Sequence, residues 1–477
     1  MIILILIAGL ILRIYKINQS LWLDEAINVT FVKNLNLKSL ITEYSIGDFH
    51  PPLYHILMRG WILLFGTSEF SIRLPSVIFG LATVYVVYLI GRKLFEEKTA
   101  LIAATLIATS PLHIYYSQEA RMYMMAAFLA SVSVYFFVSI IKKDNFFYWI
   151  GFIISTALVL YSDYLPYFIL PAYICYLLIF RKNIPKSVKK TFIPSFILIS
   201  VLVLPWFLVF PKQLSAGLST ASIFPTWASV VGSSSFKDLL ITYVKFVIGR
   251  ISHDNNLIYA FLFAPAGAIF ALLLFLSFFR LSNLRFLLWL WLMIPLLGAF
   301  LISFFIPVFA YFRLIFVLPA FYLLIAASIT LINWQKYIRF FLILTLAVNL
   351  ISLGIYYSNT KFQRENWKEA VAYIQSVSTS DSVVLFEASN PFLPYVYYDK
   401  GRVNAYGALQ NIDPTQEEVS QKVDKLTHNT QKVFLFQYLS PITDPEGFVF
   451  SELSKKGFGN VSTKDFDGVG FVYEFVR

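Results

Sequence analysis

Carboxylate, imidazole and guanidinium side chains gather in a few short motifs of an otherwise apolar chain. The first motif, LWLDEAINV, carries Asp24 and Glu25 directly after an N-terminal apolar segment. Adjacent residues of a helix point about 100° apart, so the two carboxylates cannot act on one atom in the same way. One of them could serve as a general base while the other makes a structural contact. The alternative is that both acids complement the dipole of a helical first turn.

A second motif, GDFHPPLYHILMRGW, places Asp48, His50 and His55 around a Pro-Pro turn, with Arg59 one turn later. Proline at such a turn fixes an extended entry and then permits a helix to begin. The two imidazoles, with Asp48 or Asp24, are suitable ligands for a divalent metal. The alternative is ordinary polarity at a membrane interface. We predict that no metal or other cofactor is required, with metal binding as the alternative.

Three further motifs each carry one or two ionisable residues. In YYSQEARMYMM, Glu119 and Arg121 fall in a break between two apolar segments, where ionisable groups usually have a function, although a simple loop ion pair is the alternative. Arg313 in AYFRLIFVLP lies near the end of an apolar segment and could snorkel to the interface. Asp163 in YSDY is equally compatible with turn chemistry. The chain contains no Walker-type phosphate loop, CxxC or HExxH, which argues against nucleotide-driven transport.

The composition decides which class of protein must position these motifs. Of the 477 residues, 58% are hydrophobic and 14% are charged, whereas soluble proteins average about 45–50% and about 25%. This composition excludes a soluble enzyme and a disordered chain. A disulfide scaffold is excluded because the only cysteine is Cys175. We therefore predict a polytopic α-helical membrane protein, in which the net charge of +11 reflects basic loops at the bilayer and not a nucleic-acid partner.

The charge divides the chain near Ser358. Residues 1–357 hold 26 Lys and Arg against 12 Asp and Glu, and residues 358–477 hold 12 against 15. We predict a membrane domain over 1–357 and a soluble α/β domain over 358–477, in which RENWKEAVAYIQ and PTQEEVSQKVDKL form helices and SVVLFEA and KVFLFQYL form strands. About eleven apolar segments are near the length that a bilayer needs: 1–17, 70–91, 100–117, 121–141, 146–162, 164–180, 191–210, 257–279, 286–306, 311–333 and 338–357.

Lysine and arginine set the predicted orientation. With a cytoplasmic N-terminus every short inner loop is basic, as the positive-inside bias requires; these loops carry Arg92, Lys93, Lys98, Lys142, Lys143, Arg181, Lys182, Lys186, Lys189, Lys190, Arg280, Arg285, Lys336 and Arg339. Arg13 and Lys16 contradict the bias. Nine of the twelve acids then fall near the outer face, together with the tail. Two long outer loops, 18–69 and 211–256, complete this map, and the first contains interfacial helices from Asp24 to Asn34 and after Pro52.

The motifs LWLDEA, DFHPPLYH, SEFSIRLPS, YSQEARMYMM and NWKEAVAYI occur in an order that resembles the polyprenyl-phosphate-dependent glycosyltransferases of the GT-C fold. Dolichyl-phosphate-mannose protein mannosyltransferases and lipid A aminoarabinose transferases are among these enzymes. The resemblance implies that Asp24 matches the catalytic base and that the Glu119–Arg121 segment faces the same cavity. It also implies a sugar donor on a lipid phosphate. Some relatives carry His in place of Asp163, and many carry Arg-Tyr where this chain has Arg313-Leu314.

The residues agree with that chemistry. A sugar on a phosphodiester already has a good leaving group and needs no general acid, unlike a glycosidic bond. One carboxylate, Asp24, suffices to deprotonate the acceptor hydroxyl, and direct attack inverts the anomeric centre. Arginine binds phosphate bidentately, which suits Arg121, Arg313 and Arg59. The other candidates, Glu25, Asp48, His50, His55, Glu119 and Asp163, would shape the sugar and acceptor site.

We therefore predict an integral plasma-membrane glycosyltransferase that acts on the extracytoplasmic face. Its partners would be a polyprenyl-phosphate-linked sugar, a protein, lipid or glycan acceptor, and the lipid bilayer. A metal-dependent lipid-linked oligosaccharide transferase is the alternative enzyme, and a flippase or transporter for lipid-linked sugars is the alternative without catalysis. Transporters often place charges at mid-membrane, whereas the acids of this chain lie near one face.

Overall fold

The computed structural model describes residues 1–223, 235–279, 282–331, 334–410 and 414–477. They form two compact units. Among the described residues, the first comprises Met1–Ile17, Leu35–Ser219 and 235–358, and the second comprises Asn18–Asn34, 220–223 and Asn359–Arg477. The division at 357 and 358 stays a prediction. In the structure, the segment that carries Asp24 and Glu25 groups with the C-terminal tail, although its neighbours in sequence belong to the helical unit.

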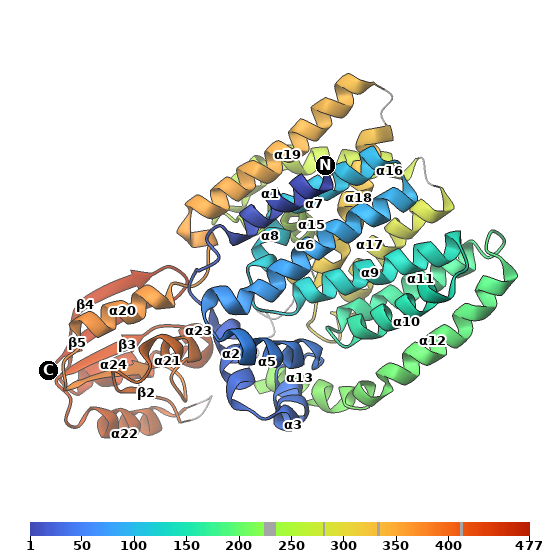
Figure 1. Cartoon of the computed structure of the whole chain (residues 1–477). Coiled ribbons are helices and arrows are strands. Elements are labelled where there is room, and N and C mark those ends of the chain that lie inside the picture. Colours follow the sequence, from blue (N-terminus) through green and yellow to red (C-terminus); the bar gives the residue numbers. More distant parts are fainter. Residues whose placement is uncertain (224–234, 280–281, 332–333, 411–413) are drawn as a thin grey trace. The chain divides into compact units, whose positions relative to one another are not determined.

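The first unit is built from apolar helices (Figure 1), and every predicted span coincides with a helix or a broken pair of helices. Among the described residues, seven helices are long and apolar enough to cross a membrane, or eight if one bent pair counts as a span. The predicted count of eleven therefore stays a prediction, because three segments form shorter apolar helices. The helices are α1 (Ile2–Ile14), α6 (Glu69–Leu94), α7 (Glu97–Ala108) with α8 (Pro111–Ser117), α9 (Tyr123–Lys142), α10 (Phe146–Leu160), η2 (Leu165–Phe168) with α11 (Ile169–Ile179), α12 (Lys186–Phe207), α16 (Asn256–Phe278), α17 (Asn283–Ile302), η3 (Tyr311–Val317) with α18 (Leu318–Leu331), and α19 (Gln335–Ser358).

Burial separates central from peripheral helices in this unit. In the span formed by η3 and α18, 89% of the apolar stretch is buried inside the protein. In the span of α16 this share is 22%, and large apolar side chains such as Phe261 are exposed. A helix that is apolar on every side and still exposed needs lipid as its solvent. The first unit is therefore a membrane-embedded bundle, which confirms the predicted fold class.

A buried arginine of α1, Arg13, packs against the bend between α7 and α8. The helix axis turns by 59° between Ala108 and Pro111, where proline cannot continue the preceding helix. Arg13 is fully buried here: its NH1 donates to the Ala108 carbonyl at 3.0 Å, its Nε donates to Ser117 at 3.1 Å, and its NH2 lies 2.8 Å from Nδ1 of His113. Arg13 thus makes hydrogen bonds inside the bundle and does not lie in a loop. The positive-inside bias of loop residues therefore does not apply to it.

The predicted outer loops contain helices. In the first, α2 (Leu23–Asn34) and α5 (Leu53–Phe65) confirm the two predicted helices, and α3 (Leu37–Ser39), the π-helix η1 (Leu40–Tyr44) and α4 (Ser45–Gly47) lie between them in sequence. Their interfacial position stays a prediction. In the second, α13 (Phe210–Ile223) and α15 (Phe236–Ile248) were not predicted. Residues 224–234 of that loop and the predicted inner-loop Arg280 lie outside the described residues.

The tail forms a five-stranded sheet in the order β2-β1-β3-β5-β4 (Figure 1). Strands β2, β1 and β3 are parallel, whereas β5 is antiparallel to both β3 and β4. The two predicted helices and two predicted strands are confirmed as α20, α22, β1 and β3. The bounds are η4 (Thr360–Phe362), α20 (Trp367–Val377), β1 (Ser382–Phe386), α21 (Leu393–Asp399), β2 (Ala405–Gly407), α22 (Gln416–Thr427), β3 (Lys432–Phe436), α23 (Ser440–Thr443), α24 (Phe448–Lys455), β4 (Gly459–Phe466) and β5 (Gly470–Val476).

Both faces of this sheet are covered, which explains the uninterrupted apolar sequence of β1 and β3. Alternate residues of a strand point to opposite faces. On one face Val384 and Phe386 pack with Trp367 of α20 and Tyr395 of α21. On the other face the alternate strand residues pack with helices α22 and α24, through Val383, Leu385, Val433, Leu435, Val419, Val423, Val449 and Leu453.

Candidate active site

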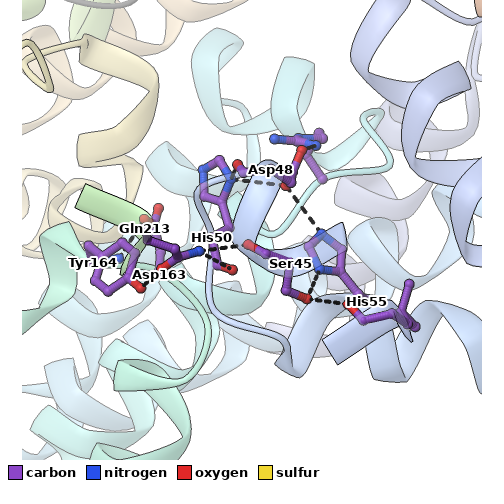
Figure 2. A network of polar contacts seen from close by, with 9 residues as sticks. Ser45, Asp48, His50, His55, Asp163, Tyr164 and Gln213 are labelled. Carbon is purple, nitrogen blue, oxygen red and sulfur yellow. Dashed lines mark hydrogen bonds and ion pairs between the residues drawn. The ribbon is translucent and has the colours of Figure 1, made fainter. Parts of the chain in front are cut away.

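Asp48 is the centre of a polar cluster in the first unit (Figure 2). Its Oδ1 accepts from NH1 of Arg121 at 3.1 Å, and its Oδ2 lies 3.0 Å from Nδ1 of His50 and 3.2 Å from Nε2 of His55. Phe49 has a φ of 59°, in the left-handed region, where the chain reverses after α4. The reversal lets His50 contact Asp48, and the following Pro-Pro turn starts α5, which carries His55. Four predicted residues are thus brought together.

The cluster holds Asp48 as a carboxylate. Burial alone would raise the pKa of Asp48, but the charge of Arg121 and the bonds from His50 and His55 hold that pKa well below its usual value. Burial lowers the pKa of His55, with Asp48 opposing the shift, which favours a neutral ring. An ionised Asp48 favours the proton of His55 on Nε2, which leaves Nδ1 as an acceptor 2.9 Å from the Ser45 hydroxyl. That hydroxyl is shared, because it also donates to the Leu40 carbonyl at 2.8 Å. His55 therefore links Ser45 to Asp48.

Polar residues from α12 and α13 support the loop around Asp48. Gln213 donates its amide to the carbonyl of Ser45 at 2.6 Å and to that of His50 at 3.3 Å, and it contacts the hydroxyl of Tyr164 (Figure 2). Tyr164 in turn accepts from the indole of Trp206 at 2.9 Å. Sequence reasoning missed these residues, because single Ser, Gln and Tyr side chains in apolar segments carry no motif.

Asp163 lies beside this support. Its Oδ1 accepts from the backbone N–H of Tyr164 at 2.6 Å, and its side chain is buried. Asp163 lies close to the Gln213 network in Figure 2. Its predicted role at the substrate site stays a prediction.

The remaining cations and Glu119 surround the α8–α9 connection. Glu119 and Arg121 are both buried there. Arg313 lies in η3, which packs against α9; its NH1 donates to the Val308 carbonyl at 3.3 Å, and its Nε has no hydrogen-bond partner among the described residues. Arg250 was not predicted, because it lies outside every motif. It stands 4.8 Å over the ring of Tyr115 and interacts electrostatically with Glu119.

Arg59 is partly buried on α5, four residues after His55. Residues four apart share one face of a helix. Arg59 is thus carried on the same side of α5 as the imidazole that contacts Asp48.

Asp24 and Glu25 occupy the first turn of α2 in the second unit. Glu25 is fully buried, whereas Asp24 is partly exposed. This difference matches the expectation that neighbouring helical carboxylates face different surroundings. The backbone N–H of Leu23 donates to Oε2 of Glu365 at 3.2 Å, so the turn that carries Asp24 is tied to the tail.

No group of three or more His, Cys, Asp or Glu side chains in the described residues is arranged to hold a metal ion. In the predicted metal-ligating motif, His55 uses one nitrogen for Ser45 and the other for Asp48. A metal at His55 would therefore have to displace one of these bonds. Metal binding by this motif is an untested alternative.

Residues 49–208 match the sequence model of the dolichyl-phosphate-mannose-protein mannosyltransferase family. No protein with a curated description matches the chain. Among solved structures, ArnT from Cupriavidus metallidurans is 11% identical, with a TM-score of 0.57 over 99% of this chain and 97% of that chain. The oligosaccharyltransferase AglB from Archaeoglobus fulgidus is 14% identical, with a TM-score of 0.55 over 99% of this chain and 73% of that chain.

Two of these structures contain lipid phosphates: ArnT was solved with undecaprenyl phosphate, and AglB with an inhibitory peptide and a dolichol-phosphate. At such low identity the structural matches establish the fold, while the family match supports it from sequence over about a third of the chain. Together they confirm, at the level of the fold, the resemblance predicted from the ordered motifs: the chain is a multi-pass membrane protein with the GT-C fold.

Proposed function

We propose that this protein transfers a sugar from a polyprenyl-phosphate donor to a hydroxyl group of a protein, lipid or glycan acceptor. The observation that carries the proposal is the buried cluster of Asp48, His50, His55 and Arg121 on a GT-C fold, within or next to the segment that matches the mannosyltransferase family. The lipid phosphates bound to ArnT and AglB support a donor of the same class.

Asp24 is the proposed general base. Its carboxylate takes the proton of the acceptor hydroxyl while the oxygen attacks the anomeric carbon. The new carbon–oxygen bond forms as the bond to the phosphate oxygen breaks, and the lipid phosphate leaves with the electron pair. The product keeps the sugar with inverted configuration, and the proton stays on Asp24. The partial exposure of Asp24 supports this role, because a base must reach its substrate.

Arginine side chains would bind the donor phosphate. Arg313 fits this role because its buried Nε makes no hydrogen bond in the described part of the chain, and a planar guanidinium matches a phosphate. Arg121 is the second candidate, with Asp48 fixing one of its NH groups at 3.1 Å. Arg59 and Arg250 add positive charge. We assign the shaping of the sugar and acceptor site to Glu25, His50, His55, Glu119 and Asp163.

The test of this function is sugar transfer from a labelled polyprenyl-phosphate donor by the purified protein in proteoliposomes. Replacing Asp24→Asn should lower turnover about 100-fold to 10,000-fold, the usual contribution of a general base. Glu43→Gln, which changes an exposed acid on η1, is the matched control and should leave turnover unchanged. Turnover of D24N near that of the wild type rejects Asp24 as the base. Movement of the lipid across the bilayer with no glycosylated product would instead favour a flippase.

The active face is proposed to be extracytoplasmic, since the short loops rich in Lys and Arg would lie inside. A single cysteine at exposed Glu446 in a Cys175→Ser background tests this. A membrane-impermeant maleimide should label Cys-substituted Glu446 in intact cells. Labelling only after permeabilisation contradicts the proposed orientation.

A further inference from the structure

The segment from Asn18 to Asn34 is hydrogen-bonded to the C-terminal tail at successive positions. Each bond joins a residue just before or in the first turn of α2 to a residue of the α/β fold, and both partners belong to the second unit. The bonds run from Arg364 N to Gln19 Oε1 at 3.0 Å, from Lys368 N to Ser20 Oγ at 3.1 Å, from Leu21 N to the Tyr398 hydroxyl at 2.9 Å, and from Leu23 N to Glu365 Oε2 at 3.2 Å.

Among these tail residues, Glu365 joins the α2 segment to further groups of the tail. Besides the Leu23 N–H, the indole of Trp367 donates to its Oε2 at 2.8 Å and the hydroxyl of Tyr438 donates to its Oε1 at 2.9 Å. The first backbone N–H groups of a helix have no partner within the helix. Glu365 supplies that partner to Leu23, which is the residue directly before Asp24. The carboxyl group therefore fixes the turn on which Asp24 stands.

The anchor lies at the edge of the sheet where α/β folds bind ligands. Tyr438 follows β3 by two residues, and the connection after β1 leads to α21 on one face while that after β3 leads to α24 on the other. In open α/β sheets, the carboxyl ends of two such strands form the ligand crevice. Here Leu23 packs against the cluster that contains Trp367 and Tyr438. The chain's own α2 segment thus occupies this position.

Glu365 is also electrostatically linked to Asp24. Burial raises the pKa of Glu365 to about 7, and the charge of Asp24 adds to the rise, against the three hydrogen bonds that lower it. The other titratable groups at this place are Tyr438, whose pKa burial and the two acids raise, and Tyr398, which holds Leu21. Two nearby carboxyl groups resist being ionised together. Below neutral pH, Glu365 is therefore the protonated member of the pair.

We propose that Glu365 is a positioning residue for Asp24: its carboxyl group caps the first turn of α2 and fixes the turn that carries Asp24. The inference rests on the proposed function for its catalytic consequence, but its structural part does not. When Glu365 loses its proton, a second negative charge appears beside Asp24. That charge repels Asp24 and opposes an anionic donor, so transfer falls as the pH rises through the titration of Glu365.

Hydrogen exchange of the full-length protein tests the anchor without any need for activity. Backbone exchange within 18–34, corrected for the intrinsic effect of pH, should rise at least tenfold in Glu365→Ala. Glu365→Gln, which keeps the shape and stays neutral, should match the wild type at pH 6 and exchange more slowly than the wild type at pH 8.5. If Glu365→Ala fails to fold, Tyr438→Phe removes one donor and should raise exchange in the same segment by a smaller factor. Unchanged exchange in both variants overturns the proposal.

Activity supplies the second readout. The pH profile of transfer should lose its component near pH 7 in Glu365→Gln and keep it in Glu387→Gln, a buried acid after β1 that bonds to Ser440 and not to the α2 segment. A profile of Glu365→Gln identical to the wild type overturns the electrostatic link. Full transfer by D24N together with faster exchange in Glu365→Ala would reject Asp24 as the base and leave the anchor standing, so the two failures are distinguishable.

Discussion

The guanidinium of Arg121 lies 3.1 Å from Oδ1 of Asp48 and joins two segments that are 73 residues apart in the sequence. The other carboxylate oxygen is shared by His50 and His55. One charge thus organises the polar cluster of the helical unit, and its removal takes a counter-ion from Arg121.

We expect Asp48→Asn to destabilise the protein by about 3–5 kcal/mol, because breaking one partner of a buried ion pair leaves the other charge uncompensated. Thermal unfolding of the purified protein in detergent checks this. Arg121→Gln in the Asp48→Asn background should recover part of the loss, since the stranded charge is then gone. A melting temperature of Asp48→Asn equal to that of the Glu43→Gln control would contradict the expectation.

Arg313→Gln should weaken donor binding with little effect on stability. The only hydrogen bond lost among the described contacts is the one from NH1 to Val308, at 3.3 Å. Loss of a charge-assisted phosphate contact of about 1.4 kcal/mol raises the KM for the donor about tenfold. Steady-state kinetics over a range of donor concentrations measures the change. A KM equal to that of the wild type removes Arg313 from the phosphate site.

Chelation should leave transfer unchanged. Both nitrogens of His55 are used within the protein, and the described residues offer no cluster of three metal ligands. Transfer measured with and without EDTA should agree within about a factor of two, well below the tenfold that 1.4 kcal/mol represents. A loss of activity that added Mg²⁺ or Mn²⁺ restores would favour the metal-dependent oligosaccharide transferase.

Glu387 should make the second unit less stable as the pH rises. Burial and the charge of Asp444 raise the pKa of Glu387 from 4.5 to about 8. The folded state binds the proton of Glu387 more tightly than the unfolded state does. The protonated carboxyl group therefore stabilises the fold fully below pH 4.5, and this stabilisation is lost as the pH rises through about 8. The loss amounts to at most about 5 kcal/mol.

Melting temperatures between pH 5 and pH 9 measure this effect (the tail can also be followed by hydrogen exchange in β1). Glu387→Gln, which stays neutral, should flatten the decline, whereas Glu446→Gln at an exposed position should not. An equal decline in both variants would show that Glu387 does not cause it.

The sequence predicted the elements whose pattern is local. The apolar segments, the helix from Asp24 to Asn34 and the strand SVVLFEA follow from composition and periodicity alone, and each is present. The helices α13 and α15 were missed because their mixed composition interrupts the apolar pattern that marks a span. The exposed β4 was missed because it does not alternate regularly between apolar and polar residues.

The candidate site was predictable only where a motif is short. Asp48, His50 and His55 lie within eight residues, so their meeting could be expected, whereas Gln213 comes to Ser45 from 168 residues away. Glu365 belongs to a motif, yet nothing local indicates that it bonds to Leu23, 342 residues earlier. Long-range pairing of this kind depends on tertiary packing, which periodicity does not encode.

The contact between Arg13 and the break after α7 has a consequence for how the protein is made. During synthesis, α1 reaches the bilayer about a hundred residues before His113 and Ser117 exist. The guanidinium of Arg13 then has only the Gly9 carbonyl of its own helix, water and lipid headgroups as partners. The contacts of Arg13 with His113 and Ser117 therefore form only after α8 has been made. A generic apolar anchor in place of α1 would still insert into the bilayer. It would leave the Ala108 carbonyl without the hydrogen bond from Arg13 and remove the polar contact that joins α1 to the end of α7.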